Sequence, residues 1–281
     1  MSRTRVLFLT LVAMIAFAGN SLLCRLALKT TLIDAATFTS SRLISGAVIL
    51  WLIVRVRGGT HPKSGSWISA FALFAYAAGF SFAYVSLPTS TGALLLFGAV
   101  QATMISYGIW AGEPLRKRQA IGFILALGGL IGLLLPGLSA PPLLGSGLMS
   151  GAGVAWGIYS LRGKYAREPT LATAENFLRA VPFAIVLSLV MARWASFDNR
   201  GIGYAIFSGA LASGVGYAIW YTVLKSLRVT EAATVQLSVP VIAAAGGIVF
   251  LGEHLTPRLL CAAAAILGGI AIVVFDRKQP G

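Results

Sequence analysis

Charged residues are scarce in this chain: Asp, Glu, Lys and Arg together make up 11% of its 281 residues, against about 25% in an average soluble protein. Apolar residues make up 57% of the chain. Several stretches of roughly 20 residues carry no charge, which is long enough for a helix to cross a hydrocarbon core of about 30 Å. The composition excludes an ordinary soluble domain and predicts a polytopic membrane protein.

Acidic residues are the scarcer sign of charge, with 8 Asp and Glu against 22 Lys and Arg. None of the acids falls in the middle of an apolar stretch. A proton-coupled exporter of cationic compounds usually needs such a buried acid, so the sequence argues against that mechanism but leaves open coupling through a group at the mouth of a cavity. The net charge of +14 does not indicate nucleic-acid binding, because the cations lie in short loops between apolar stretches, as membrane topology requires.

Signatures of catalysis and of metal binding are also missing. The chain contains no H-E-x-x-H, G-x-S-x-G or Walker A motif, and no G-x-G-x-x-G between a strand and a helix. Its two cysteines, Cys24 and Cys261, are too few for a disulfide framework or a metal cluster. We expect a protein that is not an enzyme and that has no cofactor and no metal.

What the chain does have is an internal repeat. The equivalent residues, at constant spacing late in each half and with small gaps earlier, are Phe17 and Trp156, Ser21 and Ser160, Arg42 and Arg179, Phe80 and Trp220, Gly112-Glu113 and Gly252-Glu253, and Gly128-Gly129 and Gly268-Gly269. Two apolar copies of one module are typical of secondary transporters. We expect a first module at residues 1–138 and a second at 139–281.

Ten apolar stretches are predicted to be transmembrane helices. Their approximate bounds are 6–28, 34–54, 67–86, 89–111, 119–136, 143–161, 171–192, 201–224, 230–251 and 257–275. Each module then has five helices, and because five is odd the second module must cross the membrane in the opposite sense. The predicted fold is an all-α integral membrane protein with ten transmembrane helices, arranged as two inverted-topology five-helix repeats around a central cavity.

The distribution of Lys and Arg predicts the orientation. Most of the cations outside the helices, such as Arg116, Lys117 and Arg118, fall on the side of the two termini, and the positive-inside rule places that side in the cytoplasm. We expect a multi-pass protein of the bacterial inner membrane. The first apolar stretch resembles a signal peptide, but because it has a counterpart around Trp156 we expect it to be retained.

Candidate substrate-binding residues are of two kinds. Neutral polar side chains in the middle of the helices can recognise charged ends of a substrate without a fixed counter-ion, and hydrogen bonding between helices is the alternative role; these are Asn20, Gln101, Ser160 and Gln236. Aromatic residues concentrate on the third, fourth, sixth and eighth helices and are candidates to line a cavity, with packing or lipid contact as the alternative; these are Tyr76, Phe80, Tyr84, Phe97, Trp156, Tyr159, Tyr217, Trp220 and Tyr221.

A third set of residues is predicted to act in structure or gating. Arg42 and Arg179 lie inside predicted helices, where they can bond to neighbouring helices or bind a substrate carboxylate. Pro182 and Pro240 interrupt two helices and can either kink them or expose backbone to a cavity. Gly129 and Gly269 are predicted to allow close helix packing, with a hinge as the alternative.

These features resemble the drug/metabolite transporter superfamily, specifically its EamA-type members. The resemblance rests on the Gly-Glu turn late in each half (Gly112-Glu113 and Gly252-Glu253), on the spaced glycines of the helix that follows it, and on an Arg in the second helix of each repeat. It implies a basket of ten helices whose cavity is lined mainly by helices 1, 3, 4, 6, 8 and 9, with helices 5 and 10 at the periphery. The aromatic-rich arrangement looks most like the YddG-type aromatic amino-acid exporters.

The expected function is export of small amphipathic metabolites, first of all aromatic or apolar amino acids, by alternating access. Aromatic residues would hold the side chain and the polar set would hold the zwitterionic end, with transport driven by the substrate gradient. The alternative is a broad-specificity drug or metabolite exporter, with or without proton coupling. The expected partners are a small-molecule substrate and the lipid bilayer, with no nucleic acid and with the oligomeric partner left open.

Overall fold

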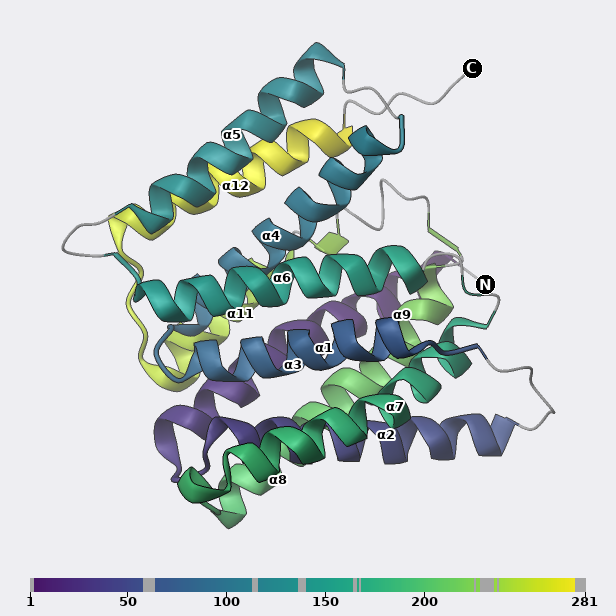
Figure 1. Cartoon of the computed structure of the whole chain (residues 1–281). Coiled ribbons are helices and arrows are strands. Elements are labelled where there is room, and N and C mark those ends of the chain that lie inside the picture. Colours follow the sequence, from purple (N-terminus) through teal and green to yellow (C-terminus); the bar gives the residue numbers. More distant parts are fainter. Residues whose placement is uncertain are drawn as a thin grey trace.

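The computed structural model describes residues 3–57, 64–112, 116–135, 140–163, 166, 168–224, 226–227, 235–236 and 238–275. Throughout these residues the only regular structure is helical. Figure 1 shows long helices packed side by side in a bundle, with the start of α1 and the end of α12 at the same end of it.

The helices follow the predicted spans. The first half contains α1 (Arg3–Thr30), α2 (Ala35–Arg57), α3 (Trp67–Tyr84), α4 (Thr89–Trp110) and α5 (Lys117–Leu134). The second half contains α6 (Leu143–Gly163), α7 (Pro169–Val190), the short η1 (Ala192–Trp194), α8 (Asn199–Phe207), η2 (Ser208–Val215), α9 (Gly216–Leu224), α11 (Ser238–Leu251) and α12 (Pro257–Phe275). Because α8, η2 and α9 follow one another without a break, they form one span. The predicted all-helical membrane fold is confirmed.

Length and composition agree with a membrane location. In the described part of the chain, 7 helices are long and apolar enough to cross a membrane, and α11 and most of α12 are shorter apolar helices. Large apolar side chains also cover the outside of the bundle; Phe8, Ile124 and Val249, for example, are 63%, 68% and 73% exposed. A surface of this kind is suited to lipid rather than to water.

The helix contacts are symmetric between the two halves. The bundle pairs α5 with α12 and α2 with α7, which are the equivalent helices of the two modules. In the same way α4 packs on α6 as α11 packs on α1, and α3 packs on α6 as α9 packs on α1. Exchanging the halves maps these contacts onto themselves or onto one another, as expected for two inverted repeats. The predicted boundary between the modules, at 138 and 139, lies outside the described residues.

The repeated Gly-Glu turn has a conformational reason. Gly112 follows α4 with φ of 86° and Gly252 follows α11 with φ of 63°, a left-handed conformation that glycine adopts without strain and that commonly ends a helix. In the second of these turns, the carboxylate of Glu253 accepts hydrogen bonds from the backbone N–H of Thr89. The turn that ends α11 is thus also a contact to the start of α4.

Glycines also set the packing of α5 on α12, which lie together along one edge of the bundle in Figure 1. A Cβ atom on Gly122 would lie 2.6 Å from the carbonyl oxygen of Gly269, and one on Gly129 would lie 2.8 Å from the Cβ of Ala265. By contrast, the neighbouring Gly128 and Gly268 have no such atom within 4 Å. Gly129 and Gly269 are therefore positions of close backbone approach.

We predict that Gly269→Ala destabilises the folded protein by about 1–3 kcal/mol, because the new methyl group must displace the backbone of α5. The matched control, Gly268→Ala, enters open space on the same helix and should leave the free energy of unfolding unchanged or raise it by about 0.5–1 kcal/mol. Unfolding in detergent micelles measures both variants. Equal stabilities for the two would contradict this packing.

Candidate functional site

A cavity lies at the centre of the bundle, between helices of both halves. Its lining residues come from α1, α3, α4, α6 and α9 and are Phe17, Asn20, Ser21, Tyr76, Phe80, Leu96, Phe97, Trp156 and Tyr217. The cavity volume, measured as the space open to the centre of a water molecule, is only about 20 Å³. Because one water needs about 10–15 Å³ on that measure, the lining must move apart before a larger molecule can bind.

Aromatic rings form most of the wall. The ring centroid of Trp156 lies 4.8 Å from that of Tyr76 and 5.0 Å from that of Tyr217. Phe80 continues the row at 5.4 Å from Tyr76, and Phe17 packs edge-on against Tyr217 at 5.7 Å. These separations are in the range of favourable aromatic contacts, so the wall offers ring faces and edges to an apolar or aromatic group.

One side of the cavity is polar and is organised around the hydroxyl of Tyr76. The oxygen of Tyr76 accepts hydrogen bonds from Nδ2 of Asn20 at 3.1 Å and from Nη2 of Arg42 at 3.0 Å. The hydroxyl of Ser208 donates to Oδ1 of Asn20 at 2.5 Å, and Nε of Arg42 donates to the hydroxyl of Ser213 at 3.4 Å. We refer to these five residues as the Tyr76 cluster; they connect α1, α2, α3 and η2.

The π-helical segment η2 supplies the two serines. In a π-helix the backbone hydrogen bonds join residues five positions apart, and Ser208 and Ser213 are five positions apart in this segment. Gly209 lets α2 approach, because a Cβ atom there would collide with the carbonyl oxygen of Arg42. Single π-helical turns are frequent at functional sites, and here the segment directs two hydroxyl groups toward the polar side of the cavity.

Of the predicted substrate-binding residues, the structure brings about half to the cavity wall. Those that line it are Asn20, Tyr76, Phe80, Phe97, Trp156 and Tyr217. The others, which do not line it in this conformation, are Tyr84, Gln101, Tyr159, Ser160, Trp220, Tyr221 and Gln236.

Several of the residues outside the wall support it from behind. Tyr84 packs edge-on against Phe80 at 4.7 Å, and Tyr159 packs against Trp156 at 5.4 Å. Trp220 packs against Phe17 at 5.9 Å. Gln101 is buried on α4, whereas Ser160, Tyr221 and Gln236 are half-buried on their helices.

The residues predicted to be structural fall in different surroundings. Arg42 is buried in the Tyr76 cluster, whereas its repeat partner Arg179 donates to Glu175 on the same helix at 2.9 Å. Pro182 lies inside α7. Pro240 lies in α11.

Five members of this site were not among the predicted site residues: Phe17, Ser21, Leu96, Ser208 and Ser213. Phe17 and Ser21 are the repeat partners of Trp156 and Ser160, so the repeat itself carried a signal for them. No comparable signal exists for Ser208, because its orientation depends on the π-helical turn.

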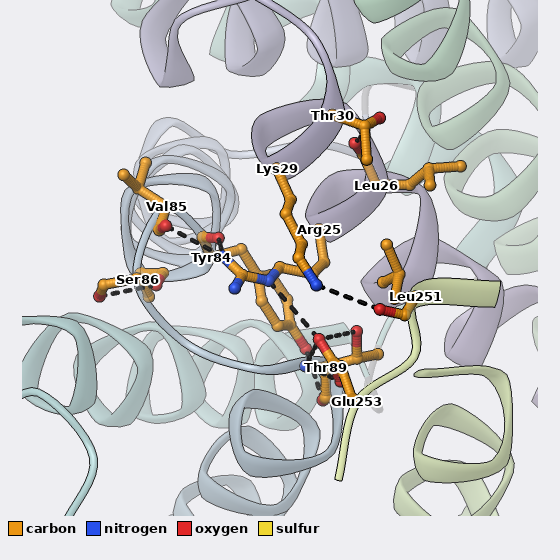
Figure 2. A network of polar contacts seen from close by, with 11 residues as sticks. Arg25, Leu26, Lys29, Thr30, Tyr84, Val85, Ser86, Thr89, Leu251 and Glu253 are labelled. Carbon is orange, nitrogen blue, oxygen red and sulfur yellow. Dashed lines mark hydrogen bonds and ion pairs between the residues drawn. The ribbon is translucent and has the colours of Figure 1, made fainter. Parts of the chain in front are cut away.

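A second polar network lies near the end of α1, and Figure 2 shows its residues. Near the end of α1, Nη1 of Arg25 donates to the carbonyl oxygens of Tyr84 (2.8 Å) and Val85 (3.0 Å) after α3, and Nε of Arg25 lies 3.6 Å from the Glu253 carboxylate. The carboxylate of Glu253 accepts two kinds of hydrogen bond from Thr89. The backbone N–H of Thr89 donates to Oε2 at 2.8 Å, and its hydroxyl donates to Oε1 at 3.2 Å. This Arg25–Glu253 network joins α1, α3, α4 and the turn after α11.

The Arg25–Glu253 network lies close to the cavity. Arg25 is five residues beyond Asn20 on α1, or about 8 Å along the helix axis. The carboxylate of Glu253 contacts Thr89, the first residue of α4, and the helix dipole favours a negative charge at this end of a helix. The network is therefore placed to hold the four elements together between the cavity and the end of the bundle opposite the start of α1.

Comparison with known proteins agrees with this fold. Residues 143–275, which hold the second set of five spans, match the model of the EamA-like transporter family. An uncharacterized protein of Pseudomonas aeruginosa is 54% identical over 274 residues, covering 97% of this chain and 96% of its own. A crystal structure covering 99% of this chain and 100% of its own superposes with a TM-score of 0.67 at 18% identity, which shows the fold alone.

Two further relatives have names that describe efflux or export. The probable amino-acid metabolite efflux pump of Salmonella typhimurium is 26% identical over 204 residues, 67% of this chain and 68% of its own. The threonine/homoserine exporter RhtA of Escherichia coli is 30% identical over 176 residues, 58% of each chain.

In the described part of the chain, apolar helices of two halves surround a central cavity, which is the arrangement of a multi-pass membrane transporter. Residues 143–275 belong to the EamA-like transporter family, and the named relatives are consistent with the drug/metabolite transporter superfamily. Membership implies a small-molecule substrate and a lipid bilayer around the bundle.

We predict that Glu253→Gln opens the end of the bundle that the Arg25–Glu253 network closes. The test is the labelling rate of Ser21→Cys by a membrane-impermeant maleimide from that side, in a background with Cys24→Ala and Cys261→Ala. Hydrogen bonds to a charged group contribute about 1.5–3 kcal/mol, so the rate should rise roughly tenfold or more.

The matched control for this prediction is Lys29→Gln. Lys29 donates to the carbonyl oxygen of Leu251 from an exposed position, so the labelling rate should change less than about twofold. Equal labelling of Ser21→Cys with and without Glu253→Gln would contradict a closing role for the network.

Proposed function

We propose that this protein exports small amphipathic metabolites, and in particular amino acids with aromatic or apolar side chains, across the bacterial inner membrane by alternating access. The observation that carries the proposal is the composition of the central cavity. Its wall is aromatic on one side and bears the amide of Asn20 and the hydroxyl of Tyr76 on another.

Such a cavity is suited to a molecule with one apolar and one polar end. The rings of Trp156, Tyr217 and Phe80 can stack on an apolar side chain. The amide and hydroxyl groups can receive the zwitterionic end of an amino acid through hydrogen bonds. A sugar, by contrast, needs polar contacts around most of its surface, and the described wall has few of them.

Alternating access follows from the inverted repeats. If the two modules adopt slightly different conformations, exchanging those conformations closes one side of the cavity and opens the other. The closed Arg25–Glu253 network marks one side. With the termini in the cytoplasm, as the positive-inside rule predicts, this network faces the periplasm and must open to release an exported substrate.

The proposed driving force is the substrate gradient. Among the described residues that line the cavity there is no Asp or Glu, whereas proton exchange at the binding site usually needs a titratable group there. Proton coupling through a carboxylate at the mouth of the cavity, of which Glu253 at the closed end is the example, is the second candidate.

The named relatives support the choice of amino acids. The Salmonella typhimurium protein is described as a probable amino-acid metabolite efflux pump and the Escherichia coli protein as a threonine/homoserine exporter. The aromatic wall also suits other amphipathic compounds, so a broad-specificity drug or metabolite exporter is the alternative. Gln101, Ser160 and Gln236 lie outside the wall in the closed conformation, and we propose that they join it when the cavity expands.

The test is efflux from liposomes that contain the purified protein and are loaded with tryptophan, phenylalanine or threonine. We expect each amino acid to leave these liposomes faster than it leaves loaded liposomes without the protein. The efflux rates should saturate with amino-acid concentration. If none does so, the amino-acid assignment is wrong, and the same vesicles loaded with amphipathic drugs test the alternative.

We predict that Trp156→Ala slows efflux of tryptophan and phenylalanine roughly tenfold, because one aromatic contact contributes about 0.5–1.5 kcal/mol beyond the area it buries. The matched control is Trp110→Ala, since Trp110 is 82% exposed at the end of α4, and it should leave both rates unchanged. Equal effects of the two substitutions would contradict a cavity wall that holds the substrate side chain.

A further inference from the structure

Arg42 is the largest fully buried side chain in the described structure and carries a positive charge into the centre of the bundle. The residue is 1% exposed. Within the described residues, no Asp or Glu forms an ion pair with it. Its Nη1 atom is buried and has no hydrogen-bond partner there. A charge that is removed from water without a counter-ion is costly, so this arrangement requires an explanation.

Of the two equivalent arginines, only Arg42 lacks a counter-ion among the described residues. Arg179, the equivalent residue of the second module, lies 2.9 Å from Glu175, four positions earlier on α7. The position four before Arg42 is Phe38, which is fully buried. One copy of the module therefore neutralises its arginine within its own helix, and the other does not.

The neighbours of Arg42 compensate its charge only in part. The hydroxyls of Tyr76 and Ser213 accept from it, and the rings of Tyr76 and Phe80 lie over the guanidinium at 5.1 and 4.9 Å from its Cζ. All of these groups are neutral. The arrangement holds the guanidinium in place and leaves both its net charge and one donor nitrogen available.

This charge lies directly behind the cavity wall. Tyr76 and Phe80 both line the cavity, and the same two rings contact the guanidinium of Arg42. The oxygen of Tyr76 accepts from both Arg42 and Asn20, which uses its two lone pairs and leaves its own hydrogen to donate. The polar side of the cavity thus combines hydrogen-bond donors with a nearby positive charge, the combination that a carboxylate accepts from most strongly.

We propose that the carboxylate of the substrate binds at the Tyr76 cluster, with Arg42 as its counter-charge. The inference rests on the proposed function, because it places the substrate in the same cavity, and it goes further by requiring a carboxylate. Amino acids and other small carboxylic acids would bind, whereas the corresponding amides and amines would not. Arg42 acts mainly through Tyr76 in the closed conformation and offers its free Nη1 when the cavity expands.

The test measures binding to the purified protein in nanodiscs through the fluorescence of Trp156, which packs on Tyr76. The ligands are phenylalanine, 3-phenylpropionate, phenylalaninamide and phenethylamine, and Trp156→Phe identifies the part of the signal that comes from the cavity. For the wild-type protein we expect phenylalanine to bind at least roughly tenfold more tightly than phenylalaninamide, as expected for loss of a charged hydrogen bond.

The decisive quantity is the ratio of the two dissociation constants in the variants. Arg42→Gln should reduce the preference for the acid to within about twofold, and Arg42→Lys should retain part of it because the charge remains. Tyr76→Phe, which keeps the ring and removes the hydroxyl, should also weaken the preference and serves if Arg42→Gln does not fold. The control is Arg179→Gln, whose partner Glu175 lies away from the cavity wall, and it should leave the ratio unchanged.

The outcomes separate this inference from the proposed function. If 3-phenylpropionate binds with the same dependence on Arg42 while no amino acid binds, the amino-acid assignment fails and the carboxylate site stands. If amides and amines bind as tightly as the acids, or if no carboxylate in the panel binds, the inference is overturned. A folded Arg42→Gln variant with the wild-type ratio overturns it as well.

Discussion

The hydroxyl of Tyr76 is the point on which the centre of the structure depends. In a membrane-spanning bundle, the surrounding lipid offers no hydrogen bonds, so a buried polar group must find its partners on other helices. Tyr76 accepts from Asn20 on α1 and from Arg42 on α2, and Asn20 accepts in turn from Ser208 on η2. These bonds fix three helices of the first module against one of the second and give the cavity its polar side.

Duplication explains both the symmetry of the bundle and the asymmetry of the site. Equivalent helices pack in equivalent ways, and the repeat partners Phe17 and Trp156 both line the cavity. The copies differ where chemistry is expected: Arg179 has a carboxylate on its own helix, whereas Arg42 has Phe38 at the corresponding position. A duplicated scaffold can keep its packing in both copies while one copy leaves a charge for a ligand.

The sequence predicted the helices because long apolar stretches and a repeat leave few alternatives. It predicted the cavity wall only in part. A helix that is apolar all round does not show which face meets lipid and which meets the cavity, so Gln101 and Ser160 were placed on the correct helices but lie outside the wall. The approach of Arg42 to Tyr76 and of Glu253 to Thr89 joins segments far apart in the chain, and the orientation of Ser208 depends on a π-helical turn. None of these leaves a periodic signal.

The most direct test is an experimental structure of the protein with a transported amino acid bound, which gives the position of the ligand. The account predicts the side chain of the ligand among Trp156, Tyr217 and Phe80, with its carboxylate within hydrogen-bond distance of the Tyr76 hydroxyl. A second, apolar cavity between α4, α5 and α12, lined by residues that include Gly98, Phe123 and Ile266, is the natural alternative. A ligand bound there, or one bound centrally with its amino group toward Arg42, would contradict the account.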